Sequence, residues 1–170
     1  MHLLSQILTP ERTVCHAHGP SKKRLFETIA ELVCANEPLL HYDNILNHLI
    51  TREKLGSTGL GQGIAIPHCR VGNCTQPLGA LLSLGKPIPF DAPDDQPVDL
   101  LFVLLVPEEA RQQHLDILAN IARLFNQQQF CGRLRAARDS STLYEVACSG
   151  AESPTESNAI NYPHWTPPLG

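Results

Sequence analysis

The sequence predicts an α/β fold, in which one central sheet carries helices on both of its faces. Its segments follow the order helix, helix, strands, helix, helices. Residues 98–106, Val-Asp-Leu-Leu-Phe-Val-Leu-Leu-Val, are almost entirely apolar, which is typical of a central strand buried on both faces. Such a strand requires helices on both sides of the sheet, so the two observations together predict a layered domain.

Two helices are predicted before the sheet. The first begins after Ser21, a favourable N-cap residue, and ends near Asn36. One face of this helix is apolar and consists of Leu25, Ile29, Leu32 and Val33. The second spans residues 43–55, and Gly56 suits the left-handed conformation that often follows a helix.

Strands and further helices are predicted for the rest of the domain. The glycine-rich segment 56–63 is expected to be irregular, and strands are expected at residues 64–66 and 78–84. The turn Gly85-Lys86-Pro87 is expected to end the second of these strands. Helices are predicted at residues 111–127, 132–138 and 142–149, the last with Thr142 and Glu145 at capping-box spacing.

Composition limits the domain organisation and the class of partner. A chain of 170 residues is expected to form one domain, residues 1–150, followed by a flexible tail rich in Pro, Ser and Glu at residues 151–170. A net charge of −4 argues against nucleic acid as the main partner. No apolar stretch approaches the roughly 20 residues of a membrane span, and the first residues lack the pattern of a signal peptide. The protein is therefore expected to be cytoplasmic, without membrane insertion.

The sequence suggests neither disulfides nor a cofactor. Its six cysteines include no CxxC pair and are expected to be reduced. His68, Cys69 and Cys74 form one loose cluster, whereas zinc sites bring paired ligands twice, so no metal is expected. Neither GxGxxG nor a phosphate-binding GK[ST] triplet is present, and Ser57 is not in a GxSxG motif.

His68 is the principal candidate for chemistry. A flexible glycine-rich segment leads to Ile66-Pro67-His68, and proline favours the end of a strand over a helix interior. The imidazole is therefore expected at the point where a strand gives way to an exposed loop. A free pKa of about 6.5 leaves most of it neutral and nucleophilic near pH 7. The alternative is a structural histidine without chemical function.

Three further features are compatible with a phosphoryl group at His68. The glycine-rich segment can turn its backbone N–H groups toward anionic oxygens. Arg52, near the end of the second helix, can pair with phosphate, although it can equally be a solvated charge. His114 begins the helix after the buried strand, and it meets His68 if their strands are parallel neighbours. Its alternative is a surface residue at a helix start.

The run Thr51-Arg52-Glu53-Lys54-Leu55-Gly56-Ser57-Thr58-Gly59-Leu60-Gly61-Gln62-Gly63-Ile64-Ala65-Ile66-Pro67-His68 closely resembles the active-site block of type-2 enzyme IIA domains of the bacterial phosphotransferase system. These domains serve mannitol and fructose permeases. Three further runs resemble the nitrogen-regulatory branch of the family: residues 21–24, 90–102 and 133–137. The resemblance spans roughly Leu3 to Val146 and does not cover the tail. It implies an α/β sandwich with a mixed, largely parallel central sheet of about five strands.

The resemblance also implies residue roles. His68 matches the phosphorylated histidine of the family, with Nε2 as the modified atom, and His114 matches its second active-site histidine. Arg52 matches an arginine close to the phosphoryl group. The loop that binds the phosphoryl group is expected to include Ser57, Thr58 and Gly59. Cys69 departs from the family pattern, in which a residue such as glycine is expected.

The implied function is that of a regulatory phosphocarrier, a phosphotransferase component that forms a phosphohistidine without any cofactor. Its donor is an HPr-like nitrogen phosphocarrier protein, and its targets include potassium-transport regulators or sensor kinases. One alternative is the enzyme IIA of a fructose/mannitol-type sugar permease, which passes phosphate to an enzyme IIB. Another is a binding module in which His68 is inert.

Overall fold

The computed structural model describes residues 3–149, so the tail predicted at residues 151–170 lies outside the described part. The helices are α1 (Leu3–Ile7), η1 (Pro10–Arg12, a 3-10 turn), α2 (Lys22–Cys34), α3 (Tyr42–Leu55), α4 (Arg111–Phe125), α5 (Gln128–Ala136) and α6 (Ser140–Ser149). The strands are β1 (Thr13–Ala17), β2 (Gly59–Gly61), β3 (Ile64–Ala65), β4 (His68–Val71), β5 (Leu78–Ile88) and β6 (Val98–Pro107).

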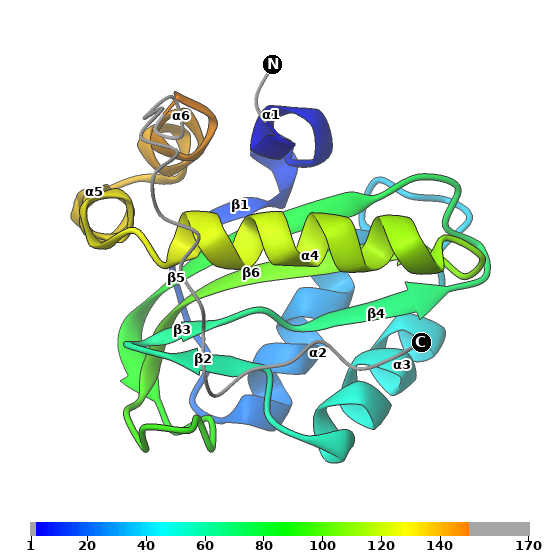
Figure 1. Ribbon diagram of the computed structural model, residues 1–170, viewed down its shortest axis with the longest axis horizontal. Helices are drawn as coiled ribbons and strands as arrows, with labels where there is room; N and C mark the ends of the chain where they lie inside the picture. Colours follow the sequence, from blue (N-terminus) through cyan, green and yellow to red (C-terminus); the bar gives the residue numbers. More distant parts are fainter. Residues whose placement is uncertain (1–2, 150–170) are drawn as a thin grey trace.

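One sheet forms the middle layer of the protein, and helices cover both of its faces (Figure 1). Helices α2 and α3 pack on one face, whereas α1, α4, α5 and α6 pack on the other. The strand order is β1-β5-β6-β3-β2, and β4 also pairs with β6. Strands β1 and β5 are parallel, and so are β3 and β4 with β6, whereas β5–β6 and β2–β3 are antiparallel. The predicted fold, a mixed and largely parallel sheet between helices, is confirmed.

Strand β6 is the central strand that its apolar sequence predicts. Its side chains alternate between the two cores, as the pleat requires. Leu100, Phe102, Leu104 and Val106 lie in the core under α4, and Leu101, Val103 and Leu105 lie in the core under α2 and α3. Because both faces are buried, the strand carries no polar alternation.

The helices begin and end close to the predicted residues, and the deviations have identifiable causes. The side chain of Ser21 caps α2 by accepting a hydrogen bond from the backbone N–H of Arg24, as predicted. Helix α6 begins at Ser140, earlier than predicted, because Asp139 rather than Thr142 caps it. The carboxylate of Asp139 accepts from the backbone N–H of Thr142 at 2.7 Å.

The glycine-rich segment is more regular than predicted. Gly56 has φ 158° and ψ 145°, which is extended backbone and not the predicted left-handed conformation. Residues 59–61 form β2, which pairs antiparallel with β3. Gln62 and Gly63, with φ 59° and 83°, make the tight turn between the two strands. The glycines therefore serve a hairpin, whereas the sequence pattern suggested an irregular loop.

Of the two strand boundaries predicted at prolines, the one before Pro67 is confirmed and the one at Gly85-Lys86-Pro87 is wrong. Strand β5 continues through Gly85-Lys86-Pro87 to Ile88, with a shift of register after Ser83. Pro67 separates β3 from β4, but both segments pair with β6 in one continuous parallel register. The carbonyl of Pro67 still accepts a hydrogen bond from the N–H of Leu104 at 2.9 Å. Proline removes a donor but not an acceptor, so pairing resumes beyond it.

The sequence pattern missed the N-terminal elements α1 and β1. Arg12 helps to fix them, because its buried guanidinium donates to the carbonyls of Gly79 and Ile7 at 2.9 and 3.0 Å. Strand β1 then lies parallel to β5 at the sheet edge. Among residues 3–149, the helices are all too short or too polar to cross a membrane.

Candidate functional site

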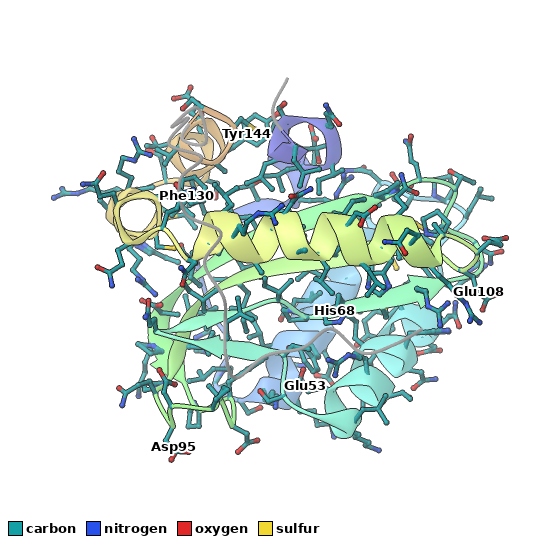
Figure 2. The ribbon with its side chains drawn as sticks, viewed as in Figure 1. Glu53, His68, Asp95, Glu108, Phe130 and Tyr144 are labelled. Atoms are coloured by element: carbon teal, nitrogen blue, oxygen red, sulfur yellow. The ribbon has the colours of Figure 1, made fainter. Side chains whose placement is uncertain are left out.

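A cavity of about 470 Å³ opens beside β4, where α3 and the start of α4 approach the same edge of the sheet. Figure 2 labels His68 on the β4 segment between these two helices. The cavity is lined by Asn47, His48, Thr51, Arg52 and Leu55 from α3, by His68, Cys69 and Arg70 from β4, and by Glu108 and His114.

The three residues predicted to carry the chemistry lie together in this cavity. The rings of His68 and His114 are 5.4 Å apart between centroids, in an edge-to-face arrangement. The Nε of Arg52 donates to Nε2 of His68 across 3.3 Å. The topology explains the meeting, because β4 and β6 are parallel neighbours, as the sequence suggested. His68 begins one strand, and His114 follows the other in the first turn of α4.

The predicted exposure of His68 is wrong. His68 is the first residue of β4 and is only 1% exposed. The pKa of His68 is lowered to about 3, mainly by burial and with smaller contributions from the nearby charges of Arg52 and His114. A hydrogen bond to the backbone of Ile66 acts in the opposite direction. The imidazole is therefore neutral over the whole physiological pH range, which leaves one ring nitrogen unprotonated.

The backbone selects which nitrogen of His68 carries the proton. Its Nδ1 lies 2.7 Å from the carbonyl oxygen of Ile66. A carbonyl oxygen can only accept, so Nδ1 carries the hydrogen and Nε2 keeps the lone pair. That lone pair faces the guanidinium of Arg52. Nε2 is thus the nucleophilic atom of this ring.

His114 contributes an unused polar atom to the cavity. The residue is 5% exposed, and its Nε2 has no hydrogen-bond partner among residues 3–149. Burial lowers the pKa of His114, and the charges of Arg70 and Arg52 act in the same direction. A buried polar atom without a partner is costly, so this atom is suited to a ligand that can accept its hydrogen bond.

Arg52 is the cation nearest to the nucleophile. Its Nη1 donates to the carbonyl of Gly56 at 2.8 Å, which fixes the guanidinium next to His68. It makes no ion pair with any carboxylate of the described chain. Burial lowers the pKa of Arg52 and Glu53 opposes this effect, but a guanidinium stays charged at neutral pH. Its positive charge is therefore available to an anion.

The three predicted loop residues do not line the cavity. The hydroxyl of Ser57 donates to the carbonyl of Phe90 at 2.7 Å, and the N–H of Gly59 donates to the Ser57 hydroxyl at 3.0 Å. The hydroxyl and N–H of Thr58 both donate to the carboxylate of Glu53. Their role in binding a phosphoryl group stays a prediction, while their hydrogen bonds hold the loop itself.

Sequence reasoning missed Arg70, which also lines the cavity. Its guanidinium donates to the carbonyl of Glu108 at 3.3 Å, so it lies near the start of α4. A signal was present in the sequence. His68 and Arg70 are two residues apart on a strand, and side chains at this spacing point to the same face.

Cys69 points away from His68 and into the core under α2 and α3. It is 7% exposed, and burial raises the pKa of its thiol, which makes the sulfur unreactive. All six cysteines are free thiols. Within residues 3–149, no group of three or more His, Cys, Asp or Glu side chains is arranged to hold a metal ion.

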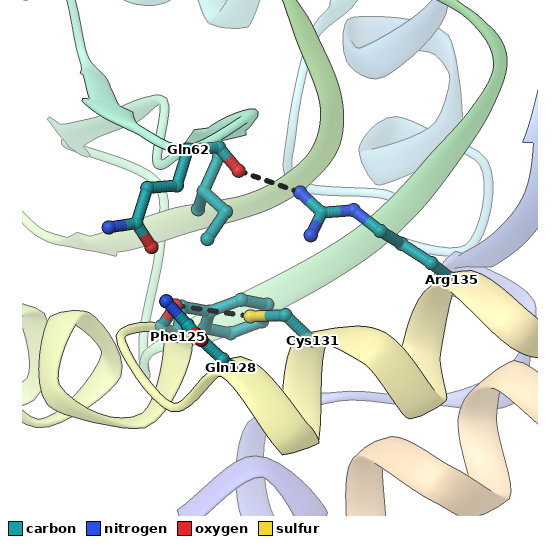
Figure 3. Close-up of a pocket in the computed structure, with 6 residues that line it drawn as sticks. Gln62, Phe125, Gln128, Cys131 and Arg135 are labelled. Atoms are coloured by element: carbon teal, nitrogen blue, oxygen red, sulfur yellow. Dashed lines mark hydrogen bonds between the residues drawn. The ribbon is translucent and has the colours of Figure 1, made fainter. Parts of the chain in front are cut away.

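A second cavity, of about 320 Å³, lies between α5 and the turn that joins β2 to β3 (Figure 3). It is lined by Gln62, Ile64, Phe125, Gln128, Cys131 and Arg135. Arg135 reaches across it and donates to the backbone carbonyl of Gln62 at 2.8 Å. None of the predicted site residues belongs to this cavity.

Comparison with known proteins agrees with the geometry. Residues 6–147 match the family described as "Phosphoenolpyruvate-dependent sugar phosphotransferase system, EIIA 2". The chain belongs to this family. It is accordingly a phosphotransferase component with an EIIA 2 fold.

Relatives within the EIIA 2 family are similar over most of the chain. A nitrogen regulatory protein of Pseudomonas aeruginosa is 50% identical over 143 residues, which cover 84% of this chain and 93% of that protein. One of Escherichia coli is 42% identical over 154 residues, or 90% and 94% of the two chains. The crystal structure of nitrogen regulatory protein IIA-Ntr from Neisseria meningitidis matches with a TM-score of 0.78 and 39% identity, over 85% of this chain and 98% of that one. The resemblance to the nitrogen-regulatory branch is confirmed.

Proposed function

We propose that this EIIA 2 protein is a regulatory phosphocarrier of a nitrogen-related phosphotransferase system. It accepts a phosphoryl group on Nε2 of His68 and controls partner proteins according to its phosphorylation state. One observation carries the proposal. A neutral imidazole has its Nδ1–H bound to the Ile66 carbonyl and its Nε2 lone pair 3.3 Å from Nε of Arg52, which carries no carboxylate partner in residues 3–149.

The proposed donor is a phosphohistidine on a small HPr-like phosphocarrier protein that docks over the cavity. The Nε2 lone pair of His68 forms the new N–P bond as the N–P bond of the donor breaks, and the donor ring nitrogen keeps that electron pair. The Nδ1 hydrogen stays in place, so the product ring is positively charged, and its N–H still donates to the Ile66 carbonyl. The transfer needs no nucleotide and no metal, since both partners are histidines.

The cavity side chains then have distinct roles. The phosphoryl oxygens carry the charge in a transfer that depends mostly on positioning and charge stabilisation. Arg52 lies beside Nε2 and neutralises that charge. Nε2 of His114, which has no hydrogen-bond partner within residues 3–149, donates to a phosphoryl oxygen. Ser57 and Gly59 belong to the proposed phosphoryl-binding loop, and Thr58 supports this loop through its hydrogen bonds to Glu53.

Phosphorylation changes the surface that partners meet. The phosphoryl group brings about two negative charges, one of them offset by the positive ring, into a cavity whose rim includes Leu55, a leucine that is 76% exposed. An apolar rim favours docking, and a new dianion beside it changes which surfaces can approach. This supports a switch that acts on soluble regulators in the cytoplasm, such as potassium-transport regulators or sensor kinases, for which the nitrogen-regulatory relatives provide the precedent of regulation.

The second candidate is an enzyme IIA of a fructose/mannitol-type permease that passes the phosphoryl group to an enzyme IIB. The family description as a sugar phosphotransferase system favours it. The chemistry at His68 is identical in both cases, so transfer onward separates them. Rapid loss of the label from His68 to an added IIB supports the second candidate, whereas retention of the label supports the regulatory role.

The test is phosphorylation with purified general phosphotransferase proteins and labelled phosphoenolpyruvate. Wild-type protein should gain one acid-labile, alkali-stable phosphate, and His68→Ala should gain none. His18→Ala, which removes an exposed histidine, should be labelled like the wild type and serves as the control. An undiminished label on His68→Ala would rule out the proposed acceptor and favour the interpretation of His68 as inert.

A further inference from the structure

A partly buried ion pair lies close to the His68 cavity without lining it. The carboxylate of Glu53 is 7% exposed, and the Nζ of Lys22 lies 2.7 Å from its Oε2. Glu53 follows Arg52 at the end of α3, and Figure 2 labels both Glu53 and His68. A buried carboxylate is costly unless it is paired and hydrogen-bonded. Because Glu53 is the neighbour of Arg52 in α3, the contacts of the Glu53–Lys22 pair bear on the His68 site.

Glu53 and Lys22 hold the loop between α3 and β2. The carboxylate of Glu53 accepts from the Thr58 hydroxyl at 2.6 Å and from the Thr58 N–H at 3.1 Å. Lys22 also donates to the carbonyl of Phe90 at 3.2 Å, which in turn accepts from the Ser57 hydroxyl. Thr58 is fully buried, so these hydrogen bonds are shielded from water.

The same loop is connected to both reactive side chains. The carbonyl of Thr58 accepts from the N–H of Ile66 at 3.0 Å, and the carbonyl of Ile66 receives the Nδ1–H of His68. The carbonyl of Gly56, two residues before Thr58, receives Nη1 of Arg52. A single threonine therefore connects the carboxylate of Glu53 to the imidazole through a chain of three hydrogen bonds.

We infer that Lys22, Glu53 and Thr58 are positioning residues for the His68 site. The network fixes the Ile66 carbonyl that selects the Nδ1–H tautomer of His68, and the Gly56 carbonyl that directs the guanidinium of Arg52. None of the three lines the cavity, so they act through His68 and Arg52. The effect on transfer rests on the proposed function. In-line transfer is sensitive to placement, and a shift of about 1 Å can slow a reaction roughly 100-fold.

The principal test compares Thr58→Val with Thr58→Ser. Valine keeps the shape of threonine but has no hydroxyl, whereas serine keeps the hydroxyl bond to Glu53. In single-turnover transfer from a phosphorylated HPr-like carrier, Thr58→Val should be about tenfold slower at saturation, with an unchanged half-saturating carrier concentration. Thr58→Ser should recover most of the rate. An equal rate for Thr58→Val and wild type would overturn the inference.

The second readout does not depend on the carrier. The 15N chemical shifts of the His68 ring report which nitrogen carries the proton. Wild type and Thr58→Ser should show the Nδ1–H tautomer alone, and Thr58→Val should show a mixture with the Nε2–H tautomer. If Thr58 bound the phosphoryl group directly, the ring signals of the unphosphorylated variant would match those of wild type, and the inference would fail.

Two further variants separate an effect on the His68 site from a failure of Thr58→Val to fold. Lys22→Met keeps an apolar stem over the Phe90 ring, where the Lys22 ammonium now lies 4.5 Å from the ring centroid, and it removes the charge together with the contacts of the ammonium to Glu53, Asp91 and the Phe90 carbonyl. It should shift the ring signals in the same direction, which decides the matter if Thr58→Val does not fold. Asp99→Asn breaks the ion pair to Arg135 outside the cavity and should change neither readout. If wild type accepted no phosphate, the proposed function would fail, while the ring signals would still test the positioning network.

Discussion

The His68 cavity and the cavity beside α5 are both lined by arginine and cysteine, but they differ in which polar groups have partners. Arg135, in the second cavity, donates to both oxygens of the Asp99 carboxylate at 2.9 to 3.1 Å and to a backbone carbonyl. Burial raises the pKa of Cys131 to about 11, and its thiol donates to the carbonyl of Phe125. Arg52 has no carboxylate partner in residues 3–149, and Nε2 of His114 has no partner there at all.

The difference shows what marks a functional cavity. Volume does not, since both cavities are large enough for a small group. In the cavity beside α5, Arg135 and the thiol of Cys131 both have partners within the folded chain. In the His68 cavity, Arg52 has no carboxylate partner and Nε2 of His114 has no hydrogen-bond partner within residues 3–149. Both groups are therefore available to an added anion. The comparison predicts that equivalent substitutions in the two cavities have opposite consequences.

The largest effect is expected for the two arginines. Arg52→Ala should slow phosphoryl transfer to His68 roughly 100-fold or more, because it removes the charge that stabilises the transferring group. Arg135→Ala should leave the transfer rate unchanged and lower the free energy of unfolding by about 1 kcal/mol, since its ion pair is partly exposed. The measurements are single-turnover transfer and urea unfolding of both variants.

Unfolding provides the control for this pair. Arg52→Ala should keep its cooperative transition, because the guanidinium supplies charge to the cavity more than packing to the core. If Arg135→Ala slowed transfer as much as Arg52→Ala, the two cavities would be coupled. The presence or absence of partners for the polar groups would then not distinguish a functional cavity.

The pH dependence of the free energy of unfolding should report on the buried histidine of the His68 cavity. His68 has a folded pKa of about 3, below the 6.5 of an unfolded histidine. Between these values the unfolded chain binds a proton that the folded chain does not, so the free energy of unfolding falls as the pH drops below 6.5. From pH 7 to pH 5 this histidine should account for about 2 kcal/mol of lost stability.

Urea unfolding of wild type and His68→Gln at pH 7 and pH 5 measures this contribution. The loss of stability between the two pH values should be smaller in the variant by about 2 kcal/mol. Some pH dependence should remain in His68→Gln, because burial also lowers the pKa of His114. Identical losses in both proteins would mean that His68 is accessible to protons in the folded state, contrary to its burial.

Much of this architecture follows from local patterns in the sequence. The apolar run of β6 predicts a strand with helices on both sides, and Ser21 predicts the start of α2. The meeting of His68 with His114 follows from two parallel neighbouring strands, which is a rule of topology. These features depend on residues close in the sequence, or on a rule that applies to every sheet of this class.

The missing parts depend on contacts between residues far apart in the sequence. The exposure of His68 was mispredicted because the carbonyl of Pro67 still pairs with Leu104, so pairing with β6 resumes at His68, directly after the strand end at proline. The hydrogen bonds of Thr58 were not predictable, since the partner of its carboxylate acceptor is Lys22 in another helix. Burial and pairing of this kind are properties of the assembled fold.

The smallest effect is expected for His114. His114→Ala should slow transfer about tenfold, the contribution of one hydrogen bond to the phosphoryl group, and less than Arg52→Ala because no permanent charge is lost. A dianion on His68 also favours a proton on the neighbouring ring, so phosphorylation should raise the pKa of His114. His114→Gln, whose amide can still donate, should recover part of the rate. NMR titration of the His114 ring before and after phosphorylation provides a separate check, and an unchanged pKa would show that Nε2 of His114 does not meet the phosphoryl group.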